Sequence, residues 1–99
     1  MTALAEINAA VRRLTILRCL AEMPGAKANA AVLDITLDAM GCGAARAVIE
    51  ADLAWLHNEG LARVEAVGPV NVAILTQAGL DTATGERRHE GVARPSLRP

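Results

Sequence analysis

A helical pattern that runs directly into a hairpin pattern constrains the fold of this chain more than any other feature. Apolar residues recur at helical spacing from about residue 44 to residue 59, and Gly60 then supplies a residue that ends helices readily. Gly68-Pro69 is typical of a turn and joins two segments with strand-like alternation, 61–67 and 70–75. This order predicts a helix followed by a two-stranded β-hairpin.

The part of the chain before this stretch predicts two more helices. Apolar spacing predicts the first over residues 3–23, where a Pro-Gly pair ends it. Residues 26–28 follow as a short extended segment that could form a first β-bridge. Asn29 is suited to cap a second helix of about three turns, which stops at the glycine-containing turn 41–43.

After the hairpin, Thr76 is suited to cap a last short helix over residues 77–84. The chain has no Phe or Tyr and only one Trp, so its core must be built from aliphatic side chains and Met. On the third helix, the inner stripe is expected to consist of Ala45, Ile49, Leu53 and Leu56. Together these elements predict one α+β domain, mostly α, over residues 1–85.

Charge is distributed unevenly along the chain. Residues 1–85 hold six basic and nine acidic side chains, whereas residues 86–99 hold four arginines and two glutamates. This last segment also contains two prolines and almost no apolar residues. We therefore expect residues 86–99 to form a basic, flexible tail that is disordered or ordered only against a partner.

Several protein classes find no support in the sequence. The two cysteines, Cys19 and Cys42, make no disulfide framework, and neither an export leader nor an apolar run of about 18 residues is present, which suggests a cytoplasmic protein. No nucleophile motif, glycine-rich phosphate loop or clustered carboxylate pair suggests an enzyme or a cofactor. His57 and His89 have no partners at metal-ligand spacing, so we expect no metal site.

The order of the elements, together with the runs DLAWLHNEGL (52–61) and LTQAG (75–79), resembles the winged helix-turn-helix superfamily. Within it, the chain resembles small arsenic-repressor-like (ArsR-like) regulators of Mu-like prophages from about residue 10 to residue 98. The residues that carry this second resemblance are Arg12-Arg13-Leu14, Ile16-Leu17, Pro24-Gly25 and Arg94-Pro95-Ser96. It implies a three-helix core, a two-stranded wing and a short C-terminal helix.

The resemblance also implies that the N-terminal half of the third helix enters the major groove of DNA. Helical spacing places Arg46, Ala47 and Glu50 on its outward face, with Ala44 beside them. Arg46 could pair with guanine, Glu50 could accept a hydrogen bond from cytosine, and Ala47 could touch a thymine methyl group. The alternative is an ordinary solvated face on which Arg46 and Glu50 form an i, i+4 ion pair.

Contacts to phosphate would have to come from other parts of the chain. The hairpin tip, residues 67–70, carries no charge, and the second helix adds Asp34 and Asp38. Arg63 and the tail arginines are expected to contact the DNA backbone: Arg87, Arg88, Arg94 and Arg98. The chain has further basic residues before the third helix, namely Arg12, Arg13, Arg18 and Lys27. The alternative for the tail is a solubilising segment.

Two functions remain open at this point. The first is a cytoplasmic, dimeric regulator that binds double-stranded DNA, and the second is a winged-helix module that binds a protein during phage assembly or packaging. The fold favours the first, which we expect, whereas the acidic domain and the uncharged hairpin tip favour the second. Neither function calls for a membrane or a small-molecule ligand.

The first and third helices each carry one further expectation. The first helix is apolar over more than half its circumference, which predicts a homodimer through this helix, with or without the last one. Trp55 lies beside the apolar stripe of the third helix and is expected to cover the core against the hairpin, with a dimer contact as the alternative.

Metal-sensing relatives of the arsenic repressor carry closely spaced cysteines on the third helix, and this chain does not.

Overall fold

The computed structural model of the chain describes residues 3–95 and forms a mostly helical α+β domain. Its elements are α1 (Ala3–Glu22), the 3₁₀ turn η1 (Pro24–Ala26), β1 (Lys27–Asn29), α2 (Ala30–Ala39), α3 (Arg46–Asn58), β2 (Ala62–Val67), β3 (Val70–Leu75) and α4 (Gln77–Thr84). These bounds confirm the predicted order of elements. The largest shift is at α3, which begins two residues later than predicted. No helix in the described part of the chain is long and apolar enough to cross a membrane.

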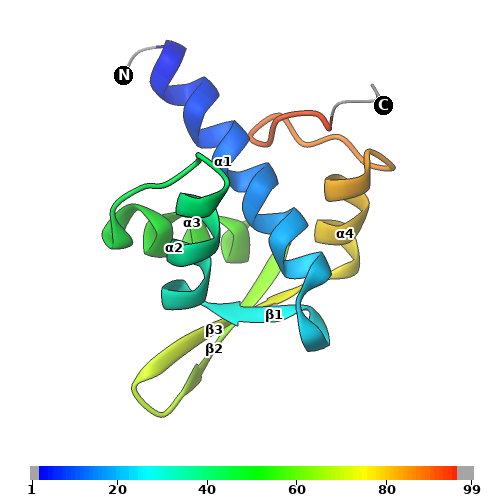
Figure 1. The fold of residues 1–99 in the computed structure, drawn as a ribbon. Helices are drawn as coiled ribbons and strands as arrows, with labels where there is room; N and C mark the ends of the chain where they lie inside the picture. Colours follow the sequence, from blue (N-terminus) through cyan, green and yellow to red (C-terminus); the bar gives the residue numbers. More distant parts are fainter. Residues whose placement is uncertain (1–2, 96–99) are drawn as a thin grey trace.

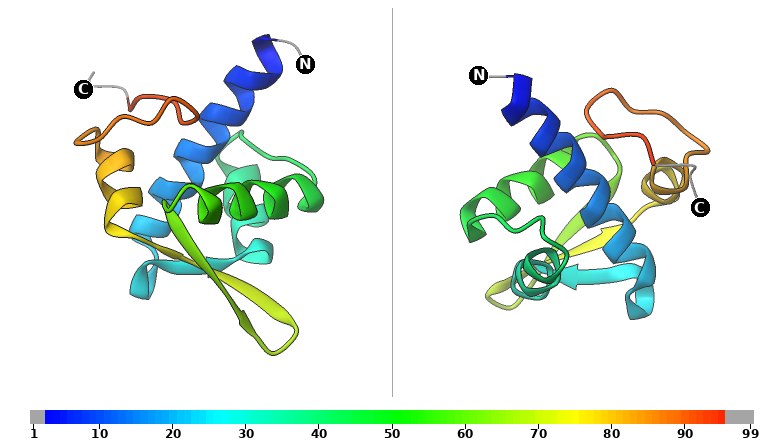
Figure 2. Two further views of the ribbon diagram at one scale, coloured as in Figure 1. Left: turned by 180° about the vertical axis from the view of Figure 1, so that it is seen from behind. Right: turned by 45° about the horizontal axis from the view of Figure 1, so that its top comes forward.

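The three strands form one antiparallel sheet in the order β1-β3-β2. In the β2–β3 hairpin, Ala62 is opposite Leu75 and Val67 is opposite Val70, so the turn falls at Gly68-Pro69. The short strand β1 pairs with the other edge of β3, where Ala28 is opposite Ala73. The helices lie on one side of this sheet, and the hairpin extends beyond them into solvent (Figure 1, Figure 2).

The core is aliphatic and lies where α1, α2 and α3 meet the sheet. Its largest fully buried members come from α1, α2, α3 and the residue before β2, and they are Ile16, Leu17, Leu20, Leu33, Leu37, Ile49, Leu53, Leu56 and Leu61. Of the predicted inner stripe of α3, Ile49, Leu53 and Leu56 are buried, whereas Ala45 is exposed. Ala45 is exposed because it is the residue that precedes the first turn of α3.

Helix ends are fixed by residues that the sequence identifies. The side chain of Asn29 accepts a hydrogen bond of 2.9 Å from the backbone N–H of Val32 and caps α2. Thr76 caps α4 in the same way by accepting from the N–H of Gly79 at 3.0 Å. Gly60 has a φ of +76°, which suits a glycine directly after the last turn of α3. All three end signals are therefore confirmed.

The first half of α1 leaves much of its apolar surface uncovered. Its apolar residues Leu4, Ile7 and Val11 are exposed, at 66%, 58% and 40% of their surfaces. This half of α1 extends beyond the rest of the domain, as all the ribbon views show (Figure 1, Figure 2). Only the second half of the helix packs into the core, so the helical pattern was correct but it does not mark burial along its whole length.

Arg12 and Arg13 are not free surface charges. Both reach Asp52 of α3, which is only 4% exposed. Arg12 binds both carboxylate oxygens of Asp52, and the Arg12 Nη2–Asp52 Oδ1 distance is 3.2 Å. This hydrogen bonding to Asp52 raises the pKa of the Arg12 guanidinium above its usual value. Asp52 thus ties α1 to α3 through a largely buried ion pair.

Residues 85–95, called the tail loop below, pack against the domain and are not the flexible segment expected there. Val92 is 5% exposed, and the N–H of Ala93 donates to the carbonyl of Ala10 in α1 at 3.1 Å. Arg13 donates to the carbonyl of Gly91 at 3.0 Å. Residues 96–99, which include Arg98, lie outside the described residues.

Trp55 packs against the core, and its ring contacts groups of α1 and the tail loop. The Arg13 guanidinium lies 4.0 Å from the ring centroid, and the ring of His89 meets it edge-on at 5.2 Å. Gly91 lies so close that a Cβ there would come 2.4 Å from Trp55 Cζ2. Position 91 therefore requires glycine for the tail loop to lie over Trp55.

Candidate macromolecule-binding surface

The residues expected to read DNA bases lie on the exposed first half of α3. Arg46, Ala47 and Glu50 are all exposed. Arg46, however, is bound to a neighbouring helix, because its Nε lies 3.0 Å from Asp34 Oδ2 of α2. The expected alternative, an Arg46–Glu50 pair, is not the one observed. The side chains of Arg46 and Asp34 remain 52% and 33% exposed, so solvent screens the pair.

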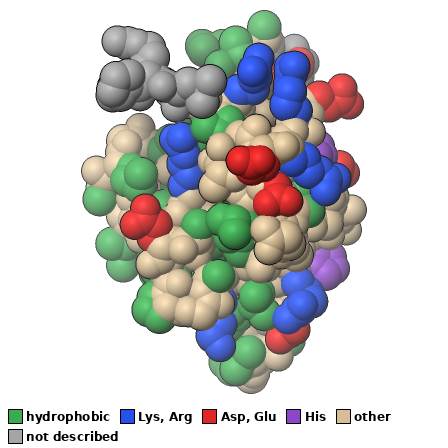
Figure 3. Space-filling model, turned by 90° about the vertical axis from the view of Figure 1, so that its right-hand side faces the viewer, with side chains coloured by type: hydrophobic (Ala, Val, Ile, Leu, Met, Phe, Trp, Pro, Cys, Tyr) green, Lys and Arg blue, Asp and Glu red, His purple; other side chains and the backbone are tan. Residues whose placement is uncertain are grey.

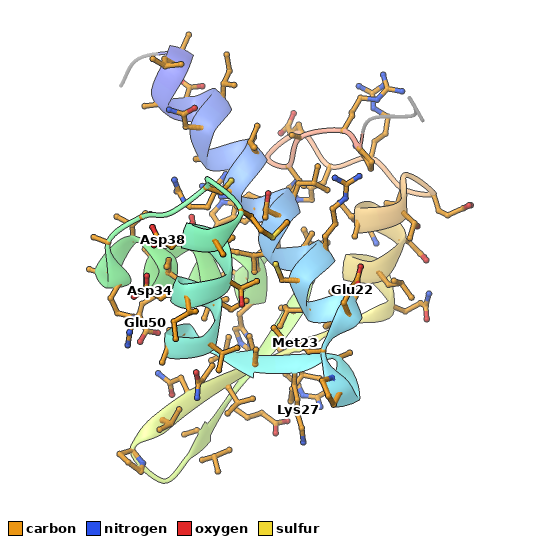
Figure 4. All side chains as sticks on the ribbon, viewed as in Figure 1. Glu22, Met23, Lys27, Asp34, Asp38 and Glu50 are labelled. Carbon is orange, nitrogen blue, oxygen red and sulfur yellow. The ribbon has the colours of Figure 1, made fainter. Side chains whose placement is uncertain are left out.

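Carboxylates outnumber the single arginine on this side of the molecule. Asp34, Asp38 and Glu50 lie along the side of the domain where α2 meets α3 (Figure 4). Of the three, only Asp34 is paired with Arg46 within the described residues. Asp38 and Glu50 thus leave an excess of negative charge close to the start of α3, where a DNA phosphate would be repelled.

Exposed aliphatic side chains also lie on α2 and at the hairpin tip. Ile35 on α2 is 73% exposed and Val32 is 40% exposed, while Val67 and Val70 at the hairpin tip are 60% and 39% exposed. A shallow groove of about 210 Å³ connects the tip to α3, and it is lined by Asn29, Ala30, Ala31, Arg46, Glu50, Pro69, Val70 and Asn71. We call this combination of α2, the first half of α3 and the hairpin tip the α2–α3 face.

The other arginines expected at DNA do not gather on this face. Arg63 of β2 is paired with Glu65 on the same strand at 2.7 Å. Arg87, Arg88 and Arg94 belong to the tail loop, which lies at the far side of the domain from the start of α3 in every ribbon view (Figure 1, Figure 2). The base-reading residues expected on α3 are therefore separated from the tail-loop arginines by the body of the domain.

The cysteines and histidines form no cluster suited to a metal. Among the described residues there is no group of three or more His, Cys, Asp or Glu side chains that could hold an ion. Burial raises the pKa of the Cys19 thiol, which favours the protonated form over the thiolate that metals bind. His57 accepts a hydrogen bond from the N–H of Val64 through Nδ1 at 3.0 Å and so links α3 to β2.

Comparison of the chain with family models, with curated proteins and with solved structures finds no match. Function must therefore be argued from the geometry described above. Two features of that geometry were not expected from the sequence, namely the buried carboxylate of Asp52 and the close approach of Gly91 to Trp55. The sequence offered one indication that Asp52 is buried. On a helical projection of α3, Asp52 lies beside the apolar stripe of Ile49, Leu53 and Leu56.

Proposed function

We propose that the domain is a winged helix-turn-helix and that its α2–α3 face binds a protein partner. The element order and the antiparallel β1-β3-β2 sheet support this fold, with α3 in the position of the recognition helix and the hairpin as the wing. Fold alone does not decide the ligand of such a domain, so the choice between protein and DNA depends on the surface.

The observation that carries the proposal is the state of Arg46. It is the only Lys or Arg of α3, and it already binds Asp34 while Asp38 and Glu50 remain unpaired within the described residues. A DNA-binding face normally offers several free positive charges, because neutralising phosphates supplies most of the affinity. The α2–α3 face offers exposed aliphatic side chains instead, which is the usual composition of a protein-binding surface.

The chemistry of the face defines the partner. Ile35, Val32 and the valines of the hairpin tip require an apolar contact, and Asp38 and Glu50 at its edge favour lysine or arginine on the other side. An amphipathic helix with a basic flank meets both requirements. By the resemblance to prophage proteins, we propose a partner in phage assembly or packaging and a cytoplasmic site of action, where the free thiols of Cys19 and Cys42 stay reduced.

Selection from a random peptide library tests this proposal. The purified protein should enrich peptides that combine aliphatic residues with Lys or Arg, and the enriched peptides, added free in solution, should lose most of their affinity for an Ile35→Glu variant. Gln77→Glu is the control, because it adds the same negative charge at an exposed position of α4, outside this face and outside the exposed half of α1. Enrichment that is insensitive to Ile35→Glu, or no enrichment at all, would contradict the proposal.

The second candidate is a DNA-binding regulator, and the exposure of Arg46 favours it. An ion pair as exposed as Arg46–Asp34 contributes only about 0–1 kcal/mol, so Arg46 could exchange Asp34 for a guanine at little cost. The groove between α3 and the hairpin tip also lies where a winged domain would meet the duplex. Titration with duplexes selected from a random pool separates the two candidates.

For either function we propose a homodimer. Leu4, Ile7 and Val11 form a stripe at helical spacing on the exposed half of α1, which a second copy of α1 would cover. Light scattering should give about twice the chain mass of 10.3 kDa at micromolar concentration. Ile7→Glu should shift the protein to monomer, and a wild-type protein that is already monomeric would contradict the dimer.

A further inference from the structure

The tail loop closes on itself at its two ends. Gly85 follows α4, and a Cβ built on it would lie 3.7 Å from Pro95 Cγ, so the loop returns to its starting point. Near its middle, His89 accepts from the N–H of Gly91 through Nδ1 at 3.0 Å, which leaves Nε2 to donate to Glu59 of α3 at 2.8 Å. Compact closed loops of this kind are fixed structures that can hold a ligand.

A cavity of about 130 Å³ lies between this loop and the end of α4. Its base includes Thr82 and Val92, which are 2% and 5% exposed and belong to the packed part of the domain. Its wall carries three arginines and one histidine of the loop, namely Arg87, Arg88, Arg94 and His89. The space is enough for several water molecules or for one small oxyanion.

The three arginines that line this cavity have no acidic partner among the described residues. In the described part of the chain, none of them forms an ion pair or a side-chain hydrogen bond, and no carboxylate lines the cavity. Figure 3 shows Lys and Arg side chains gathered at the top of the side of the molecule that it displays, with carboxylates beside and below them. Three arginines around one small cavity, without a paired carboxylate, favour an anion among them.

We propose that this cavity is a binding site for a phosphate group, held by Arg87, Arg88 and Arg94. Guanidinium groups match the geometry of phosphate oxygens and bind them through paired N–H donors. The loop backbone that carries the three arginines is fixed, because Val92, Gly91 and His89 anchor it to α1 and α3. This site does not depend on the α2–α3 face, so it can be tested separately from the proposed function.

The protein contains its own reporter for this site. Trp55 is the only tryptophan, and its ring meets that of His89, which lines the cavity. A phosphate that orders the loop around His89 should therefore change the fluorescence of Trp55. Titration with inorganic phosphate should give a saturable change that sodium chloride of equal ionic strength does not give, and calorimetry should give the same Kd.

Three variants decide whether the arginines form the site. Arg88→Gln and Arg94→Gln should each weaken phosphate binding about tenfold or more, since each removes a charged hydrogen-bond donor. Arg63→Gln changes the net charge by the same amount on the hairpin and should leave the Kd unchanged. A flat titration in both fluorescence and calorimetry overturns the proposal, and so does an unchanged Kd in both tail-loop variants.

A second ligand identifies the source of the phosphate group. A short single-stranded oligodeoxynucleotide without a terminal phosphate offers only phosphodiesters. If it fails to displace inorganic phosphate, the site takes free phosphate or a phosphomonoester. If it competes in wild type but not in Arg94→Gln, the same cavity takes phosphates of a nucleic-acid backbone.

Discussion

The α2–α3 face and the tail loop differ in whether their arginines are paired with carboxylates. On the α2–α3 face, Arg46 is bound to Asp34 and is surrounded by further carboxylates. On the tail loop, Arg88 and Arg94 have no ion-pair partner within the described residues and line a cavity free of carboxylates. The difference shows that the number of arginines near a surface does not predict its charge, because pairing with neighbours decides what a ligand meets.

Two further arginines differ from those of both regions. Arg12 and Arg13 are mostly buried and bind Asp52, so they contribute to neither surface. They are structural charges that hold α1, α3 and the tail loop together, because Arg13 also contacts Trp55 and Gly91. Substitution of their partners can test this separation of structural, paired and unpaired arginines.

Removal of the Asp52 carboxylate should have the largest effect on stability. Asp52→Ala would leave two largely buried guanidinium groups without a counter-charge, and such a loss costs roughly 3–5 kcal/mol. Urea unfolding followed by circular dichroism measures it. Glu65→Ala, which breaks the exposed pair with Arg63, should change stability by about 1 kcal/mol or less. Equal effects of the two substitutions would show that Asp52 is not a structural charge.

Gly91→Ala should have a smaller but clear effect, because it tests whether the tail loop is part of the domain. The new Cβ would meet Trp55 Cζ2 at 2.4 Å and Cη2 at 2.6 Å, so the ring or the loop must move. We expect a destabilisation of about 1–3 kcal/mol, as for overpacked cores, together with a shift of the Trp55 emission. Glu90→Ala, one residue away and exposed, is the control. A tail loop without fixed structure would tolerate both substitutions equally.

The local elements of the fold could be predicted from the sequence because their signals are local. Asn29 and Thr76 cap helices within three residues of themselves, and Gly68-Pro69 makes its own turn. The packing of the tail loop could not be predicted in this way. Its anchors are one glycine and one valine in a run rich in arginine, and the ring that Gly91 meets is far away in the sequence, at Trp55. Composition therefore suggested a flexible segment.

The candidate site shows the same limit. Helical spacing correctly predicted that Arg46, Ala47 and Glu50 are exposed on one half of α3. It could not predict the partner of Arg46, because Asp34 lies on another helix and a sequence pattern offers only Glu50 at i+4. For the same reason Arg12 and Arg13 seemed available to DNA, although their carboxylate is 40 residues away from Arg12 along the chain.

One measurement tests most directly the claim that the α2–α3 face is not a base-reading surface. Wild-type protein and Arg46→Ala are titrated with fluorescent duplexes selected from a random pool, at two salt concentrations. We predict no enriched site, and we predict that any weak binding falls with salt and is the same in both proteins, because the carboxylates of Asp34, Asp38 and Glu50 leave no net positive charge around Arg46. An enriched duplex bound with a Kd of about 10⁻⁸ M or tighter, whose preference is lost in Arg46→Ala, would contradict the account and establish the DNA-binding regulator.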